Sequence, residues 1–412
     1  MSLAGTTGTS ALASKTADIV IAGGGAAGAA CALAAARGGA RVLLVERSAQ
    51  LGGTVRQALL HTLGGLFDDS GEALHGGLAA ELTARLLAAS PHTRKRRMGK
   101  AWVLNVDPEI YAQVMEQWIA AEAGLEICLQ SEIAKVALTR GAVQEVVVRT
   151  ATGPCALRTG ALVDASGSAD VVRRIDPACV HEGAALGGFI VQMDGVAADA
   201  LRFPAGVGLA REIRQAAANG RLPPQCASVW LDAGVRDDEA YAKFSVAAGT
   251  FDAPAMQRTA ASLHDFLRRL PGFAASRISR YGSLGVRDGG RIVGEYCLSE
   301  HDIKRGSHFP DPACSACWPI EHWDPLSGLT LEYLPSGHRY QIPLRSLKVR
   351  GFSNLWAAGK CLSAEPRAQA SARVVGTCWA MGEAVAGQLL GLASRNENAP
   401  AARAVAGACE HG

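Results

Sequence analysis

Three glycines near the start of the chain have the spacing of a loop that binds phosphate. They follow the pattern Gly23-x-Gly25-x-x-Gly28, and an acidic residue, Glu46, comes eighteen residues after the last glycine. The first glycine permits a tight turn, the second lets the backbone approach a pyrophosphate, and the third lets a helix pack closely on a strand. The helix N-terminus then attracts the pyrophosphate, and Glu46 can accept hydrogen bonds from ribose hydroxyls. The pattern therefore predicts a dinucleotide site, which fits either NAD or FAD.

Cys314-x-x-Cys317 is a second pattern that can carry chemistry. Its spacing is that of a redox dithiol or of half a zinc site. However, the pair does not open a helix after a strand, and no partner Cys-x-x-Cys occurs in the sequence. We therefore favour a packing role, with a redox or metal role as the alternative, and we expect no metal site.

The charge balance names no polymeric partner. The chain has 41 lysines and arginines against 38 aspartates and glutamates, without the clustered basic excess of a nucleic-acid-binding protein. One basic run, Arg94 to Arg97, is a candidate RNA patch, although such runs are more often a solvated loop or a helix end. We expect no nucleic-acid partner and keep RNA binding as an alternative.

Cysteine usage and apolar patterning bear on the compartment. Eleven cysteines are spread through apolar segments, as at Cys31 and Cys378, which indicates a reducing compartment rather than a disulfide framework. No stretch approaches the ~20 uninterrupted apolar residues of a membrane span. We expect a cytoplasmic protein without a membrane span, and we leave its oligomeric state open.

The residues around the glycines predict the elements that must position them. Residues 18–22 form a short apolar strand, residues 29–37 an alanine-rich helix, and residues 41–46 a second buried strand. This is a βαβ unit. Residues 125–129 resemble the next parallel strand, and residues 132–150 resemble a hairpin.

At 412 residues the chain is too long for one ordinary core, so we expect two domains. Beyond about residue 181 the pattern changes to mixed strands and amphipathic helices. A last strand at 354–358 and a small-residue helix at 375–392 indicate a return to the first domain. The expected division is a disordered tail (1–16), the dinucleotide-binding domain in two parts (17–180 and 341–395), an inserted substrate domain (181–340) and a C-terminal tail (396–412).

Many short motifs, in order, resemble the FAD-dependent oxidoreductase family with a glutathione-reductase-like fold, related to the flavoprotein subunits of succinate dehydrogenase and fumarate reductase. The resemblance spans most of residues 17–392. It implies an α/β fold in which a Rossmann-like FAD-binding domain carries an inserted α+β substrate domain. Besides the first βαβ unit, the motifs are Gly52-Gly53-Thr54, residues 163–167, Gly285-Val-Arg287, and residues 291–296, 342–346, 354–361 and 371–384.

The resemblance also implies which residues hold FAD. Ile133 would edge the adenine, Arg47 would lie beside the adenosine, and Lys360 would contact the ribityl chain. Gly376 and Thr377 would place a helix N-terminus at the flavin N1–C2 carbonyl, where it would stabilise the anionic reduced flavin. The implied cofactor residues are Gly23, Gly25, Ala26, Ala27, Gly28, Glu46, Arg47, Gly53, Thr54, Ile133, Ala165, Ser166, Gly167, Gly359, Lys360, Gly376 and Thr377.

Four residues are candidates for substrate chemistry. Arg287 resembles the arginine that related flavin amine oxidases aim at a substrate carboxylate, with a domain-linking ion pair as the alternative. His322 and His61 are possible proton acceptors, although a packed structural histidine is an alternative for each. Arg373 comes just before the last helix, in a loop that should line the active-site face of the flavin.

We therefore expect an enzyme that transfers a hydride from a small polar amine, amino acid or alcohol to the flavin N5. No second glycine pattern with a βαβ frame occurs in the sequence, so electrons should come directly from substrate and leave to oxygen, a quinone or a protein acceptor. The alternatives are reduction of an activated double bond and an RNA-modifying or RNA-binding flavoprotein.

Overall fold

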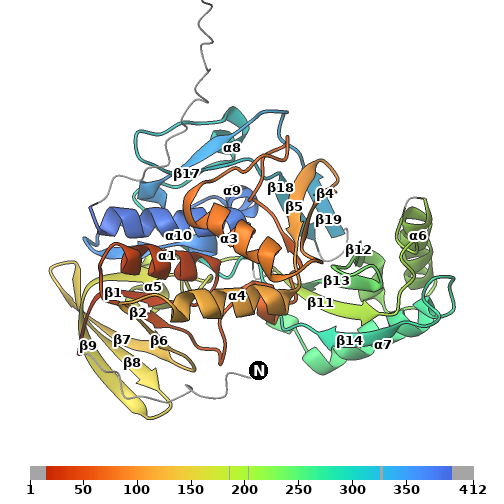
Figure 1. The fold of residues 1–412 in the computed structure, drawn as a ribbon, viewed down its shortest axis with the longest axis horizontal. Coiled ribbons are helices and arrows are strands. Elements are labelled where there is room, and N and C mark those ends of the chain that lie inside the picture. The colour runs from red at the N-terminus through yellow and green to blue at the C-terminus, as the bar shows by residue number, and fades with distance from the viewer. Residues whose placement is uncertain (1–14, 185, 203, 325–327, 392–412) are drawn as a thin grey trace, which may run out of the picture.

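The computed structural model describes residues 15–391 except 185, 203 and 325–327 (Figure 1). The tails expected at the two ends lie outside these described residues, apart from residues 15 and 16. Strand β1 begins at Thr16, one residue inside the segment expected to be a tail.

The glycine-rich loop follows a central strand of a sheet whose core strands are parallel. Strand β1 lies between β2 and β9, and β6 and β21 extend the sheet on either side. Ile19, Val20 and Ile21 are at most 4% exposed, because helices cover a parallel sheet and its strands are apolar throughout. The predicted βαβ unit is confirmed. The parallel strands are β1 (Thr16–Ala22), β2 (Val42–Val45), β6 (Leu125–Cys128), β9 (Gly153–Asp164) and β21 (Leu355–Ala357).

Two helices from opposite ends of the chain cover one face of this sheet. Helix α1 (Ala26–Arg37) packs along α10 (Val375–Leu389), red beside blue in Figure 1. A Cβ on Gly382 would lie 2.1 Å from the carbonyl oxygen of Ala27, so the helices approach closely only with glycine there. The predicted return of the C-terminal helix to the first sheet is confirmed.

The hairpin of β7 (Glu132–Thr139) and β8 (Ala142–Thr150) contributes to the opposite face. It joins the sheet through the first half of β9. Helix α5 (Asp170–Ile175) packs beside it. The hairpin expected at residues 132–150 is therefore present.

A second sheet, green in Figure 1, is antiparallel and has two different faces. On β13 the residues Ala240, Ala242 and Phe244 pack in a core with helices α6 and α7, while Tyr241 and Lys243 point to the other face. This alternation places Tyr241 and Lys243 against His61 and Thr62, at strand β3 (Thr62–Leu63). The elements are β11 (Leu186–Asp194), β12 (Trp230–Ala233), β13 (Glu239–Ala247), β14 (Arg277–Tyr281), β15 (Gly285–Val286), α6 (Ala205–Ala218) and α7 (Ala253–Leu267).

The basic run forms strand β4 (Arg94–Met98), paired with β5 (Ala101–Asn105), which pairs with β3 (Thr62–Leu63). This corrects the expectation of a loop or a helix end. Long basic side chains suit β4 because it is an edge strand, where charge opposes pairing with another chain.

The remaining elements connect the two sheets. Strand β17 packs on α10 and β18 packs on α9, although both strands lie within the segment expected to be a substrate domain. The domain boundaries stay a prediction. No described helix is long and apolar enough to cross a membrane. These elements are α2 (Gly53–Gln57), α3 (Gly77–Ala89), α4 (Pro108–Ala120), β10 (Val180–His181), β16 (Arg291–Ile292), α8 (Glu300–Arg305), β17 (Pro312–Ala316), β18 (Ile320–Asp324), β19 (Gly328–Glu332), β20 (Tyr340–Pro343) and α9 (Pro366–Ala372).

Candidate functional site

A cavity of about 360 Å³ lies between the two sheets. Its lining includes most residues predicted to hold the cofactor and two of the four predicted for catalysis. Gly28, Ile133, Gly376, Thr377, His61 and His322 do not line it. The predicted residues that do line it are Gly23, Gly25, Ala26, Ala27, Glu46, Arg47, Gly53, Thr54, Ala165, Ser166, Gly167, Gly359, Lys360, Arg287 and Arg373.

The glycine loop lies between β1 and α1 at one end of the cavity. A Cβ on Gly28 would lie 1.8 Å from the carbonyl oxygen of Gly23, and one on Gly23 would lie 2.4 Å from that of Ala165. A Cβ on Gly25 would meet only Gly53, at 3.9 Å. Gly23 and Gly28 therefore shape the backbone, whereas Gly25 keeps space open. That open space at a helix N-terminus without a side-chain cap fits a pyrophosphate.

Glu46 directly follows β2, lies beside this loop and is 6% exposed. Its Oε2 accepts a hydrogen bond from the Gly24 N–H at 2.6 Å, and its Oε1 accepts one from the Ser48 N–H at 2.8 Å. The carboxylate thus ties the loop to the second strand. It also lines the cavity, where ribose hydroxyls could donate to the same oxygens.

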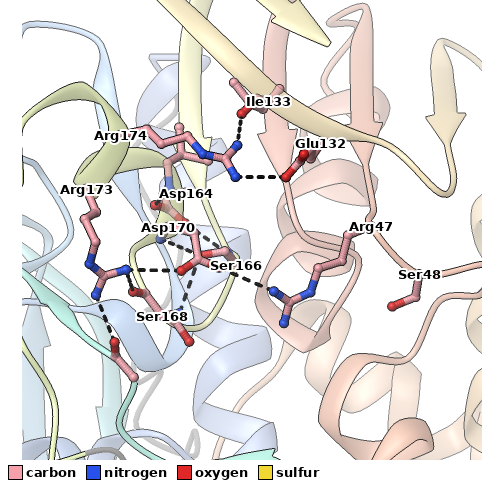
Figure 2. A network of polar contacts seen from close by, with 12 residues as sticks. Arg47, Ser48, Glu132, Ile133, Asp164, Ser166, Ser168, Asp170, Arg173 and Arg174 are labelled. Atoms are coloured by element: carbon pink, nitrogen blue, oxygen red, sulfur yellow. Dashed lines mark hydrogen bonds and ion pairs between the residues drawn. The ribbon is translucent and has the colours of Figure 1, made fainter. Parts of the chain in front are cut away.

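The loop after β9 closes this end of the cavity. Asp164 accepts hydrogen bonds from the Ser166 hydroxyl at 2.6 Å and from the N–H groups of Val171 and Val172 at the start of α5. Figure 2 shows Asp170 between Arg47 and Arg173, both of which form ion pairs with it. Arg47 is therefore held at the cavity edge by a contact from a different strand–helix connection.

Ile133 lies outside the cavity. It is 2% exposed, and its carbonyl oxygen accepts a hydrogen bond from Arg174 (Figure 2). The predicted contact with adenine has no support from this placement.

Lys360 and the start of α10 lie farther along the cavity. The Lys360 Nζ donates to the Val286 carbonyl at 2.7 Å and to the Thr54 hydroxyl at 3.3 Å. Burial lowers the pKa of Lys360 to about 8, which is the response of a cation with little solvent around it. An anionic group in the cavity would favour its charged form.

Gly376 and Thr377 lie behind the lining residues at the start of α10. A Cβ on Gly376 would lie 2.3 Å from the carbonyl oxygen of Gly65, and the buried Thr377 hydroxyl has no hydrogen-bond partner among the described residues. Val374 and Val375 face the cavity instead. The helix N-terminus is thus at the cavity, but Val374, Val375 and Cys378, which flank the predicted pair, form its surface.

Two arginines and one carboxylate form a charged cluster on the cavity wall. The Arg287 guanidinium lies 4.1 Å from the centroid of the Trp323 ring, and its Nη1 donates to the Gly187 carbonyl. The Arg373 Nη2 donates to the backbone carbonyl of Glu321 at 3.3 Å. The Glu321 carboxylate accepts hydrogen bonds from the indole N–H groups of Trp318 and Trp323.

These charges perturb one another. Burial, followed by repulsion from Arg373, lowers the pKa of Arg287 to about 9. Although burial alone would raise the pKa of Glu321, Arg373 and the two indole N–H groups hold it below its ordinary value. The cluster therefore has two cations against one carboxylate, and an anion entering it would be stabilised.

The structure does not bring the two predicted histidines into the cavity. His322 is exposed on β18, where strand alternation turns it away from its neighbours Glu321 and Trp323. His61 is fully buried behind the wall and stacks on Tyr241 at 3.7 Å between ring centroids. Burial lowers its pKa to about 4. Both placements favour the packed or surface alternative over a proton acceptor.

The lining residues that the sequence did not single out include Trp318, Glu321, Trp323 and Lys243. Alternation along the strand containing His322 was the available signal for two of them, because it puts Glu321 and Trp323 on one face. Lys243 is a single cation in the strand Glu239–Ala247, and its role depends on partners distant in sequence.

The two cysteines of the Cys-x-x-Cys pattern are free. Cys314 is buried in β17, and burial raises the pKa of both thiols, that of Cys317 to about 12. Neither lines the cavity. Among the described residues no cluster of three or more His, Cys, Asp or Glu side chains has the arrangement of a metal site.

Comparisons with known proteins agree with this geometry. The family described as FAD dependent oxidoreductase matches residues 18–407, and no curated protein sequence matches the chain. A geranylgeranyl bacteriochlorophyll reductase-like protein from Thermoplasma acidophilum has a similar fold, with a TM-score of 0.50 and 11% identity over 92% of this chain and 78% of that one.

A second solved structure, the OxyS anhydrotetracycline hydroxylase from Streptomyces rimosus, matches 91% of this chain and 63% of its own at 15% identity and a TM-score of 0.48. The narrower relation to glutathione reductase, succinate dehydrogenase and fumarate reductase stays a prediction. The expected α/β fold with a Rossmann-like domain and the expected cofactor are confirmed. By its sequence, its fold and its open glycine cradle, the chain belongs to the FAD dependent oxidoreductase family and is an enzyme that uses FAD.

Proposed function

We propose that this oxidoreductase oxidises a small polar amine, amino acid or alcohol, and that the substrate carries a carboxylate. The observation behind this proposal is the cluster of Arg287, Arg373 and Glu321 on the cavity wall. A bound anion would balance its excess positive charge, and paired guanidinium groups suit a carboxylate.

Each residue of the cluster has a separate task in this proposal. Arg287 lies over the Trp323 ring and donates to the Gly187 carbonyl, so two contacts fix its position while its other N–H groups would bind the anion. Glu321 keeps the two indoles in place through its hydrogen bonds. The tryptophans displace water from the cavity, which strengthens the attraction between the arginines and the substrate.

The bound FAD would supply the hydride acceptor, with oxygen, a quinone or a protein as the final acceptor. Gly23, Gly25, Gly28 and Glu46 would hold its ADP half, and Lys360 would contact the ribityl chain. The space above Gly25 and the position of Glu46 support these roles.

The basic run behind the RNA alternative has partners within the protein, although Arg94, Lys95 and Arg97 remain exposed. Arg96 donates to Asp232 at 2.8 Å, Arg94 lies 3.4 Å from Asp237, and Lys95 lies 5.1 Å from the centroid of the Trp102 ring. These contacts engage most of the basic run within the protein itself.

The test is to mix the purified FAD-bound enzyme with candidate substrates under anaerobic conditions. Loss of flavin absorption then measures reduction of the flavin. Amino acids and hydroxy acids should reduce it, whereas matched amines and alcohols without a carboxylate should not. Arg287→Gln should slow reduction at limiting substrate by about 100-fold, and the exposed Arg277→Gln serves as the matched control. Equal rates with and without the carboxylate would contradict the proposal. If the flavin is first reduced by a reduced dye and is then reoxidised by unsaturated acids, the result would support the reductase alternative.

A further inference from the structure

A second cationic cluster lies on the cavity wall formed by the antiparallel sheet. Lys243 is central to it. On β13 it pairs with Ile190 of β11 on one side and Trp230 of β12 on the other. All three residues line the cavity. Because Lys243 is on the face opposite the core of this sheet, its side chain is directed toward Thr62 of β3 and the cavity.

Asp232 holds this lysine in place. The Lys243 Nζ donates to Asp232 Oδ2 at 2.9 Å, and Arg96 donates to Oδ1 at 2.8 Å. His61 Nε2 lies 3.3 Å from Oδ2. Although burial alone would raise the pKa of Asp232, its neighbours Lys243, His61 and Arg96 hold it well below the ordinary value. The aspartate is therefore an anion with both oxygens occupied.

The cluster has one positive charge in excess, as the Arg287 cluster does. Lys243 and Arg96 face the single carboxylate of Asp232, and the neighbouring His61 is neutral because burial lowers its pKa to about 4. Lys243 is only 7% exposed. A cation this buried without a full counter-charge is unfavourable, and a ligand that brings a negative charge to it gains correspondingly.

Lys243 also retains capacity to donate. An ammonium group has three N–H donors. Asp232 accepts one, and the Thr62 hydroxyl, at 3.4 Å, is a weak second acceptor. The structure shows no third hydrogen bond from Nζ to the described residues. Thr62 itself lines the cavity, so the lysine head is at the cavity surface rather than behind it.

We propose that Lys243 is a specificity-determining residue that donates a hydrogen bond to a second acidic group of the substrate, while Arg287 and Arg373 bind the first. The inference rests on the proposed function, because it places the substrate in the same cavity. It narrows the substrate class to molecules with two acidic groups.

Binding of unreactive acids tests this proposal without turnover. The probes are two matched pairs, glutarate against butyrate and isophthalate against benzoate, titrated into the FAD-bound enzyme and followed by the change in flavin absorption. The wild-type enzyme should bind each diacid about 10- to 100-fold more tightly than its monoacid, the scale of one hydrogen bond to a charged group. Lys243→Gln should remove that preference and leave monoacid affinity within about 2-fold.

Two further variants keep the test informative. Lys243→Arg should restore part of the preference for the diacid, because it retains the charge. Lys135→Gln, on the exposed strand β7, is the control for charge removal at a distance. Equal FAD content and thermal stability of all variants would show that they fold. If Lys243→Gln weakened monoacid and diacid binding equally, the lysine would contribute only general positive potential and the inference would be overturned.

The two proposals fail in different ways. If wild-type enzyme bound neither acid of a pair, the carboxylate site at Arg287 and the proposed function would both be wrong. If the wild-type enzyme bound monoacids without a preference for diacids, and Arg287→Gln abolished monoacid binding, the proposed function would stand. The proposed role of Lys243 would then be wrong.

Discussion

At the scale of single residues, the two carboxylate oxygens of Glu46 have two roles: they fix the glycine loop and they can bind the ribose of the cofactor. In the structure both carboxylate oxygens accept backbone N–H groups, from Gly24 and Ser48. These contacts fix the glycine loop before any cofactor arrives. An oxygen has more than one lone pair, so each can also accept from a ribose hydroxyl.

Glu46→Ala should therefore weaken FAD binding by about 1–3 kcal/mol, or roughly 5- to 150-fold, the value of a charged hydrogen bond. The measurement is titration of the apoprotein with FAD, followed by quenching of flavin fluorescence. Glu46→Gln should fall between wild type and alanine, because an amide keeps one acceptor. Glu212→Ala, exposed on α6, is the control. An alanine variant with wild-type affinity would remove Glu46 from the cofactor site.

Site residues could be predicted from the sequence when their partners lie close along the chain. Those whose partners lie far away along the chain could not. Gly25 and Glu46 belong to a single βαβ unit, so their spacing alone predicts their meeting. The roles of Glu321 and Lys243 depend on Arg373 and Asp232, which only the fold brings close to them. His322 is a candidate proton acceptor by its chemistry alone, but strand alternation places it on the exposed face.

At the scale of elements, the glycine turn shows how one motif contains two kinds of glycine. Gly28 makes room for backbone atoms of the protein, whereas Gly25 makes room in the cavity. Gly25 has a φ of −81°, which any residue can adopt. Its glycine is therefore not required by the fold of the protein alone.

Gly25→Ala should keep the stability of the apoprotein within about 0.5 kcal/mol and weaken FAD binding by about tenfold or more. Gly28→Ala should destabilise the apoprotein by about 3 kcal/mol, because its Cβ overlaps the Gly23 carbonyl. Urea unfolding and FAD titration separate the two effects. Gly208→Ala is the control, since its added Cβ would meet nothing within 4 Å. Equal loss of stability in the first two variants would show that the open space at Gly25 is not a ligand cradle.

An element could be predicted where its own sequence pattern determines its secondary structure. It could not be predicted where contacts with distant segments determine it. The apolar runs and small-residue helices of the first sheet follow from their own sequence. Strand β4 does not, because four consecutive basic residues have low strand propensity by themselves. Its pairing with β5 and its contacts to Asp232, Asp237 and Trp102 stabilise it.

At the scale of the whole molecule, the cavity exists only where three segments of the chain meet. The first βαβ unit supplies the glycine loop, the middle of the chain supplies Lys243 and Arg287, and the last segment supplies Lys360 and Arg373. A ligand that spans them stabilises all three against unfolding. Polar groups buried at their junction also link the stability of the molecule to pH.

His61 and His75 are the clearest of these groups. Burial lowers the pKa of each to about 4, against an ordinary value of 6.5. A histidine whose pKa is lower in the folded state contributes full stability above pH 6.5, and this stability is lost as pH falls toward 4. At pH 5 the loss should be about 2 kcal/mol per histidine relative to neutral pH.

Urea unfolding of the apoprotein between pH 7 and pH 5 tests this coupling. Carboxylates also titrate on the acid side, so the informative quantity is the difference between wild type and the His61→Gln, His75→Gln double variant. The variant should lose less stability over this interval, because no buried imidazole must take up a proton on unfolding. His92→Gln, at an exposed position, should follow the wild-type curve. Parallel curves for wild type and the double variant would mean that both imidazoles already reach solvent in the folded protein, against the burial of His61 and His75 in the structure.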